Sequence, residues 1–273
     1  MCKITIVIYS NCQANGIIPN LLLNMKDIHI EHITNYNLIN NKSVLPIDLL
    51  KNCDVFIYQP IDIKHGIYST DNICSFLPEN VVKISFPYIY NSGIWGITKD
   101  SIRNDDGSIQ GNRDIILKLK LNGKSLNEII DLYLNNEIDF NYKYRFEQSI
   151  QKLRIKESNC DIKISDFIIN NIRNHKLFYT QNHPTPYLFE NISKQILDIL
   201  KSYFSLNYDY IYTDKNLLCN GPKWPVCNSD ITFWNFDYIK YPDENADEYY
   251  KELITMYYNY ELNNNDGIPD VYY

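Results

Sequence analysis

The sequence predicts an α/β fold built on a mostly parallel, doubly wound sheet. The chain opens with β-favouring residues over 3–9, and a polar turn and an apolar segment with helical spacing follow directly. Three more apolar runs, over 28–33, 54–60 and 81–88, are separated by segments that suit short helices, and the last two runs end at a proline. Strands that alternate with helices indicate βαβ units, which place the strands parallel in one sheet.

The first strand leads into a turn that contains Cys12. Ser10 is followed three residues later by Gln13, as in a capping box, so we expect Ser10 to cap a helix and Cys12 to lie in its first turn. The positive end of a helix dipole favours an anion, and a thiol placed there ionises below its free pKa of about 8.5. The alternative is a buried, unreactive cysteine beneath the sheet.

The elements after this turn follow the βαβ pattern. The first helix contains Pro19, which is expected to kink it or to shift its start. Alternation over 28–33 predicts a half-exposed second strand, and a short helix is expected over 46–50. His29 and His32 stand at an odd spacing, so they lie on opposite faces of that strand, and we interpret both as surface histidines.

The carboxyl ends of parallel strands meet at one edge of a sheet, and open α/β sheets bind their ligands there. Gln59 and the loop over 86–95 are therefore expected near Cys12. The loop combines aromatic and flexible residues, so it could wall a pocket for a ring or an acyl chain, although an ordinary packed connection explains it as well. The predicted pocket residues are Ser10, Tyr58, Phe86, Tyr88, Asn91 and Trp95.

A second strand-to-helix junction carries His183. Residues 177–186 return to the sheet pattern: a strand ends at His183, which stands between Asn182 and Pro184, and a helix begins near Tyr187. A lone histidine is more often structural than functional. Its place at the expected ligand-binding edge favours a functional role here, because a neutral imidazole suits general-base catalysis.

We expect the whole chain, residues 1–273, to form one catalytic α/β domain. Residues 114–174 predict a helical insertion, and the irregular, aromatic part over about 205–273 is expected to wrap back over the core or to cover the pocket, with a last helix over 247–260. The insertion is rich in lysine and arginine. This charge fits a phosphate-binding face or a solvated helix surface, and we favour the second.

Composition excludes several classes of function. A formal net charge of −7 argues against a surface for nucleic acid or anionic membranes. The 7 cysteines include no CxxC pair, which predicts reduced thiols and neither a metal site nor a disulfide framework. No signal peptide is recognised, and no apolar run approaches the ~18 residues of a membrane span. We therefore expect a soluble, cytoplasmic protein.

The motifs at these strand ends resemble those of a known family. Ser10-Asn11-Cys12-Gln13-Ala14, directly after the first strand, is similar to the GNCQ-type opening of the WcbI family of polysaccharide-biosynthesis acyltransferases. Tyr58-Gln59-Pro60, Phe86-Pro87 and Asn182-His183-Pro184 follow in the order of that family. The resemblance covers about residues 3–200. It departs from the family at Ser10, where glycine is usual.

The resemblance implies coenzyme A binding and transfer of an acyl group, typically acetyl, to a sugar or nucleotide sugar in surface-glycan biosynthesis. It assigns Cys12 as the reactive cysteine and His183 as its partner. The neighbouring polar groups, which would support the site or the oxyanion, are Asn11, Gln13, Gln59 and Asn182. A looser similarity to SGNH hydrolases does not extend to their triad, because Thr180 stands where their aspartate would be.

Several alternatives remain open at this stage. Cys12 could accept the acyl group as a thioester, or it could only line a site in which His183 drives direct transfer. A cysteine-based esterase or deacylase would use the same residues and ignore coenzyme A. A non-catalytic module that binds glycans or nucleotide sugars would depend on exposed aromatic residues instead.

Overall fold

The computed structural model of the chain describes residues 3–98, 102–103, 109–110, 113–204, 210–213 and 220–259. It divides the chain into two compact units. The sheet unit comprises Met1–Tyr90, Gln151–Ile172 and Lys176–Pro222, and the helical unit comprises Asn91–Ile150, Arg173–His175 and Lys223–Tyr273. The single catalytic domain expected from the sequence stays a prediction.

The sheet unit is built on four parallel strands, as predicted. These are β1 (Ile4–Ser10), β2 (Ile28–Thr34), β3 (Val55–Tyr58) and β4 (Val82–Ser85), in the order β2-β1-β3-β4. The chain winds from β1 to β2 in one direction and to β3 in the other. The boundary between β1 and β3 is therefore the topological switch point, where ligands of open α/β sheets bind.

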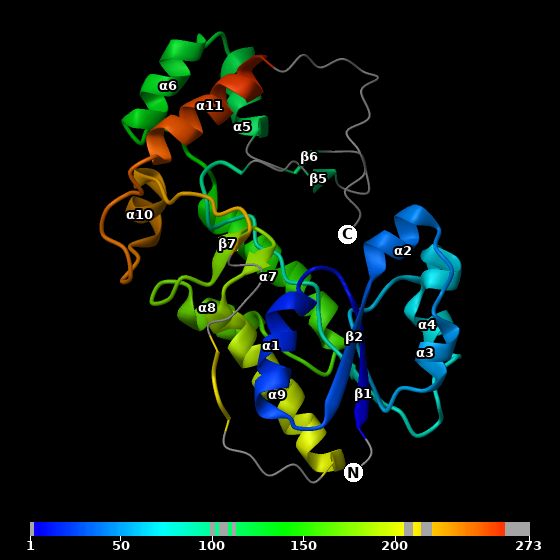
Figure 1. Ribbon diagram of the computed structural model, residues 1–273. Helices are drawn as coiled ribbons and strands as arrows, with labels where there is room; N and C mark the ends of the chain where they lie inside the picture. The colour runs from blue at the N-terminus through cyan, green and yellow to red at the C-terminus, as the bar shows by residue number, and fades with distance from the viewer. Residues whose placement is uncertain are drawn as a thin grey trace. The chain divides into compact units, whose positions relative to one another are not determined.

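Helices cover both faces of this sheet, which confirms the doubly wound prediction (Figure 1). One face carries α1 (Ala14–Asn24) and α9 (Pro186–Phe204). The other carries α2 (Asn35–Asn41), α3 (Ile47–Lys51), α4 (Thr70–Cys74) and the 3₁₀ helix η1 (Ile63–Tyr68).

The two central strands of the sheet, β1 and β3, are apolar and buried on both faces. Val7 and Tyr9 of β1 pack in one cluster with Leu50, Phe56 and Ile73 on the α3 and α4 side. Alternation leaves Ile6 and Ile8 for the side of α1 and α9, and both are fully buried. Near-continuous apolar runs are what a parallel sheet covered by helices requires.

The segment that carries His183 does not join the main sheet. β7 (Phe178–Thr180) pairs with β8 (His183–Pro184) in a separate antiparallel ribbon, so the expected return to the parallel sheet is wrong. Only two residues separate these strands, and a short connection of this kind turns the chain back on itself. The helix after them begins at Pro186, next to the predicted start.

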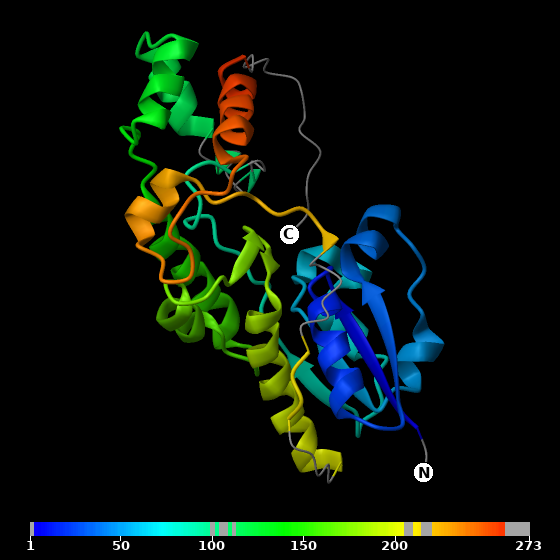
Figure 2. The same ribbon diagram turned by 60° about the vertical axis from the view of Figure 1, so that its left-hand side comes forward.

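The helical unit combines the predicted insertion up to Ile150 with the C-terminal segment, whereas residues 151–172 of that insertion belong to the sheet unit. It holds α5 (Arg113–Leu121), α6 (Leu126–Leu134), α10 (Asn228–Trp234), α11 (Ala246–Asn259) and the short strands β5 (Ile102–Arg103) and β6 (Ile109–Gln110). Figure 2 shows α11, in red, beside the green helices α5 and α6. Their shared core includes Ile116, Ile129, Tyr133, Tyr250 and Ile254.

The described C-terminal part of the helical unit contains two helices, of which only the last was predicted. The last helix is present, whereas α10 occupies a segment that was expected to be irregular. The other parts of the expected wrap, over 205–209, 214–219 and 260–273, lie outside the described residues.

Two further helices, α7 (Tyr142–Ser158) and α8 (Ser165–Asn171), complete the predicted helical segment. Two of its basic side chains make contacts within the protein. Arg145 donates hydrogen bonds to the carbonyl oxygens of Trp95 and Phe140, and Arg154 pairs with Asp166 at 2.7 Å. In the described parts of the chain, no helix is both long and apolar enough to cross a membrane.

Close packing of α1 on α9 makes Gly16 sensitive to substitution. A Cβ atom at Gly16 would lie 2.1 Å from the Phe189 ring. We expect Gly16→Ala to lower the free energy of unfolding by about 1–3 kcal/mol, because the two helices must move apart. Urea unfolding followed by circular dichroism measures this change. Phe189→Leu in the same chain should recover part of the loss, and an unchanged urea midpoint for Gly16→Ala alone would contradict the packing.

Candidate functional site

Cys12 lies in the turn between β1 and α1. Ser10 is the last residue of β1 and α1 starts at Ala14, so the expected capping box with Ser10 as N-cap is wrong. The Ser10 hydroxyl donates to the Asn11 carbonyl at 3.0 Å instead, and the Asn11 side-chain oxygen accepts the Gln13 N–H at 2.9 Å. Asparagine takes this role because its short side chain reaches the backbone two residues on.

Cys12 carries a half-buried thiol. Burial raises its pKa above the ordinary value, and its own backbone N–H opposes this only in part. The expectation of a lowered pKa is therefore wrong. Cys12 precedes the helix, and the desolvation of a thiolate outweighs the weak attraction of the helix dipole.

The turn brings Cys12 to His183, as predicted, although 171 positions separate them. The Cys12 Sγ lies 3.8 Å from the His183 Nε2, which is hydrogen-bonding distance for sulfur. The other ring nitrogen, Nδ1, lies 3.0 Å from the Thr180 hydroxyl. Thiol, imidazole and hydroxyl thus form one chain of contacts within the sheet unit.

A buried amide holds this arrangement together. The Gln13 Nε2 donates to the carbonyl oxygens of Ile89 at 2.7 Å and Asn182 at 2.9 Å. Its Oε1 accepts from the Ile89 N–H at 3.1 Å and from the Gln59 Nε2 at 3.0 Å. All four hydrogen-bonding positions of the Gln13 amide are filled, so it supports the site and has no donor left for a reaction.

Gln59 also has a supporting role. Its Oε1 accepts the backbone N–H of Asn11 at 3.0 Å, which removes that N–H from the candidate oxyanion donors. Of the donors in the described turn, the Asn11 Nδ2 has no hydrogen-bond partner, and the Cys12 N–H faces only its own sulfur. These two groups remain for a developing negative charge.

Two residues beside the turn were not recognised as site residues in the sequence. The His32 Nε2 lies 3.3 Å from the Ser10 carbonyl oxygen, and burial lowers the pKa of His32. Its interpretation as a surface histidine is wrong, because the β1–β2 register brings it to this end of the sheet. His29, with a side chain 47% exposed, does lie on the surface and contacts Glu31.

The second unrecognised residue is Tyr36, near the start of α2. Burial and, to a smaller extent, its electrostatic interaction with Cys12 raise the pKa of its phenol, so it shares the electrostatic environment of the thiol. The alternation of side chains along β2 predicts on which face of the strand His32 lies. The register of β2 beside β1 and the position of α2 do not follow from any local sequence pattern, so His32 and Tyr36 could not be placed beside Cys12.

The predicted pocket residues of the sheet unit divide into two groups. Ser10 and Phe86 are both fully buried, so they line no open pocket, and Tyr58 stacks on Phe56 at 5.2 Å on the α3 side of the sheet. Tyr88 is half-buried, and it stacks on Tyr90 at 6.4 Å. The Lys156 ammonium lies 4.9 Å from the centre of the Tyr88 ring, so packing within the sheet unit also accounts for this aromatic side chain.

The other two predicted pocket residues belong to the helical unit. Asn91 is fully buried and accepts the Gly93 N–H at 2.9 Å. Trp95 is 1% exposed and packs edge-on against Trp224 at 5.2 Å. Interior packing therefore explains both side chains, as the alternative interpretation of this loop proposed.

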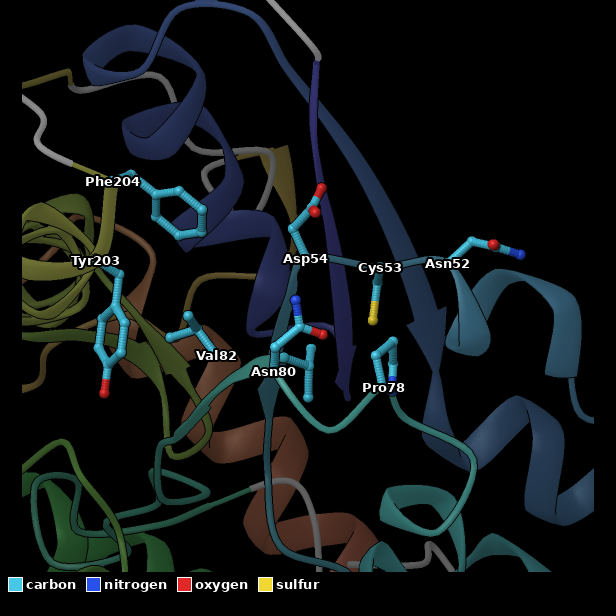
Figure 3. A pocket seen from close by; sticks show the side chains of 9 residues that line it. Asn52, Cys53, Asp54, Pro78, Asn80, Val82, Tyr203 and Phe204 are labelled. Atoms are coloured by element: carbon cyan, nitrogen blue, oxygen red, sulfur yellow. The ribbon is translucent and has the colours of Figure 1, made fainter.

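A pocket of about 340 Å³ lies at the other edge of the sheet (Figure 3). Its lining residues lie before β3, at the start of β4 and at the end of α9, whereas Cys12 follows β1, so in a parallel sheet the two sites lie at opposite ends of the strands. Figure 3 shows the Cys53 thiol, the Asp54 carboxylate and the Asn80 amide around it. This pocket is separate from the candidate site.

Comparison with known proteins identifies a matching family and a similar fold. The sequence model of a family described as "Polysaccharide biosynthesis enzyme WcbI" matches residues 5–202. A solved structure of a WcbI polysaccharide-biosynthesis enzyme, in a native form without a disulfide bond between coenzyme A and a cysteine, has a similar fold. Its TM-score is 0.74 at 16% identity, over 95% of this chain and 91% of that one. No curated protein has a significantly similar sequence.

The hydrogen bonds of Gln13 predict a large stability effect. Gln13→Leu keeps the size of the side chain but leaves buried partners on Ile89, Gln59 and Asn182 unpaired. We expect a loss of about 3 kcal/mol or more in the free energy of unfolding, measured by urea titration. The exposed Gln151→Leu, on α7, is the matched control and should stay within about 0.5 kcal/mol of the natural protein. Equal effects of the two substitutions would refute the role of Gln13.

Burial of the thiol predicts how Cys12 reacts with pH. Because its pKa is raised, the thiolate fraction at neutral pH is smaller than for a free cysteine. We expect the rate of alkylation by iodoacetamide to reach its midpoint at a higher pH in the folded protein than in the guanidinium-unfolded one. Peptide mass spectrometry reports the same cysteine in both states. A lower midpoint in the folded state would show a preformed thiolate instead.

Proposed function

The chain belongs to the WcbI family of polysaccharide-biosynthesis enzymes, and from this membership we propose that it transfers an acyl group, typically acetyl, from coenzyme A to a sugar or nucleotide sugar. The observation that carries the proposal is the 3.8 Å contact between the Cys12 thiol and the His183 imidazole. Acyl transfer needs a nucleophile and a base within hydrogen-bond reach, and this pair supplies both.

Acyl-coenzyme A is the acyl donor of the proposed reaction. The similar solved structure is a native form without a disulfide bond between coenzyme A and a cysteine. In that protein, coenzyme A is thus associated with a cysteine thiol. In this chain, Cys12 occupies the turn at the topological switch point of the sheet. A thioester placed there would meet the thiol, the imidazole and the two remaining donors of the turn.

In the first half of the proposed reaction, the His183 Nε2 takes the thiol proton as the Cys12 sulfur attacks the acyl carbonyl carbon. A carbon–sulfur bond to Cys12 forms, the bond from that carbon to the sulfur of coenzyme A breaks, and the imidazolium returns its proton to the departing thiolate. The Cys12 N–H and the Asn11 Nδ2 are the proposed oxyanion donors. One thioester replaces another, so the free energy changes little.

In the second half, His183 accepts the proton of the acceptor hydroxyl or amine as that group attacks the Cys12 thioester. The carbon–sulfur bond then breaks, and His183 protonates the Cys12 sulfur. We favour this covalent route over direct transfer because the imidazole contacts the thiol itself. Gln13 and Gln59 hold the turn in place, and no metal takes part in the proposal.

The other functions considered from the sequence have less support. A glycan-binding module would depend on its exposed aromatic side chains and would not need the 3.8 Å contact between the Cys12 thiol and the His183 imidazole. A hydrolase of the SGNH type would place a carboxylate beside its histidine, whereas His183 contacts the neutral Thr180. An acyltransferase agrees with both observations.

The proposal is tested with acetyl-coenzyme A and variants of the two central residues. At 100 times its dissociation constant the donor should stabilise the folded protein by ~2.7 kcal/mol in a thermal-shift assay. Cys12→Ala and His183→Gln should each lower the rate of coenzyme A release by roughly 10²-fold or more. Cys74→Ala and His29→Gln are matched controls outside the site and should keep full activity.

Intact-mass analysis separates the two routes. An acyl adduct on the natural protein that Cys12→Ala lacks supports the covalent route, whereas turnover without an adduct favours direct transfer. Full activity of both Cys12→Ala and His183→Gln would overturn the site assignment. Release of coenzyme A at equal rates with and without a sugar acceptor would indicate a hydrolase.

A further inference from the structure

We propose that Thr180 and Asn182 are positioning residues that hold His183 in the tautomer with its proton on Nδ1 and its lone pair on Nε2. The tautomer itself follows from contacts within the sheet unit. Its effect on turnover rests on the proposed function, because only a reaction that uses the Nε2 lone pair depends on it.

The direction of the hydrogen bonds determines the tautomer. The Thr180 hydroxyl has one proton, and it donates this proton to the Asn182 Oδ1 at 3.0 Å. An amide oxygen only accepts, so this bond cannot run the other way. The Thr180 oxygen therefore turns a lone pair toward the His183 Nδ1, also at 3.0 Å, and Nδ1 must be the donor.

The surroundings keep this direction fixed. Thr180 is 2% exposed and Asn182 is 8% exposed, so bulk water does not compete for their polar atoms. The Asn182 carbonyl oxygen accepts from the Gln13 Nε2 at 2.9 Å, which anchors the residue to the turn of Cys12. With Nδ1 protonated, the lone pair of the neutral ring lies on Nε2, 3.8 Å from the Cys12 sulfur.

The contact of His183 with an uncharged hydroxyl also suits a thioester as the acyl donor. A carboxylate in the place of Thr180 would favour the charged imidazolium, whereas a hydroxyl orients the ring without adding charge. The leaving group of an acyl-coenzyme A is a thiol with a pKa of about 8.5, which departs more readily than the alkoxide of an ester. A neutral base is sufficient for the thioester.

The tautomer can be measured without substrate. Long-range ¹H–¹⁵N correlation spectra of the folded protein distinguish protonated from unprotonated imidazole nitrogens, and His183→Gln identifies the signals of His183 among the 5 histidines. We expect Nδ1–H in the natural protein and in Thr180→Ser. Thr180→Val and Asn182→Ala should both increase the Nε2–H form, the second because the Thr180 hydroxyl proton can then turn toward Nδ1. Nε2–H in the natural protein would overturn the proposal.

Kinetics provide the second readout. Thr180→Val should lower kcat for acetyl transfer roughly 10- to 100-fold, the effect of an unpaired buried group, with little change in the KM for the donor. Thr180→Ser keeps the hydroxyl and should restore kcat to within about threefold, which a purely steric role of threonine would not predict. Thr180→Asp should move the acid limb of the pH–rate profile to higher pH, because a carboxylate stabilises the imidazolium.

The two proposals fail in different ways. If the natural protein has Nδ1–H, Thr180→Val loses it, and no acyl-coenzyme A serves as donor, the positioning role is supported and the acyltransferase is rejected. Transfer that is equally fast in Thr180→Val and Thr180→Ser would reject the positioning role and leave the acyltransferase in place. Circular dichroism of each variant verifies that it is folded.

Discussion

The geometry of the site depends on the side-chain amide of Gln13. Four hydrogen bonds connect this buried amide to Gln59 after β3, to Ile89 after β4 and to Asn182 between β7 and β8. An amide without partners is costly to bury, so a residue with all four positions filled holds its neighbours in place. The turn of Cys12 and the ribbon of His183 therefore keep a fixed separation.

The state of Cys12 follows from two opposing effects of different size. A helix N-terminus stabilises a nearby anion by about 0.3–1 kcal/mol, whereas burial can shift the pKa of an ionisable group by several units. Burial is the larger effect here, and the pKa of the thiol is raised. A thiol that stays protonated needs a base, and the imidazole at 3.8 Å is suitably placed.

Sheet topology explains why polar residues of several segments meet at this point. β1 lies between β2 and β3, so the turn after β1 has His32 on one side and Gln59 on the other. Helices leave a switch point in opposite directions, which opens a crevice at the carboxyl ends of the strands. The pocket beside Cys53 lies at the amino ends of β3 and β4, where this geometry does not arise.

The sequence by itself determined the parallel sheet, because residues 4–10 and 55–58 form apolar runs that need a layer of helices on each side. It also identified Cys12 and His183, each beside a strand. Only the tertiary structure decided that β7 leaves the sheet, that His32 reaches Ser10, and that Gln13 joins partners 46, 76 and 169 positions away. The physical reason is that apolar periodicity is a local property of the chain, whereas register, burial and hydrogen-bond partners depend on residues that only folding brings together.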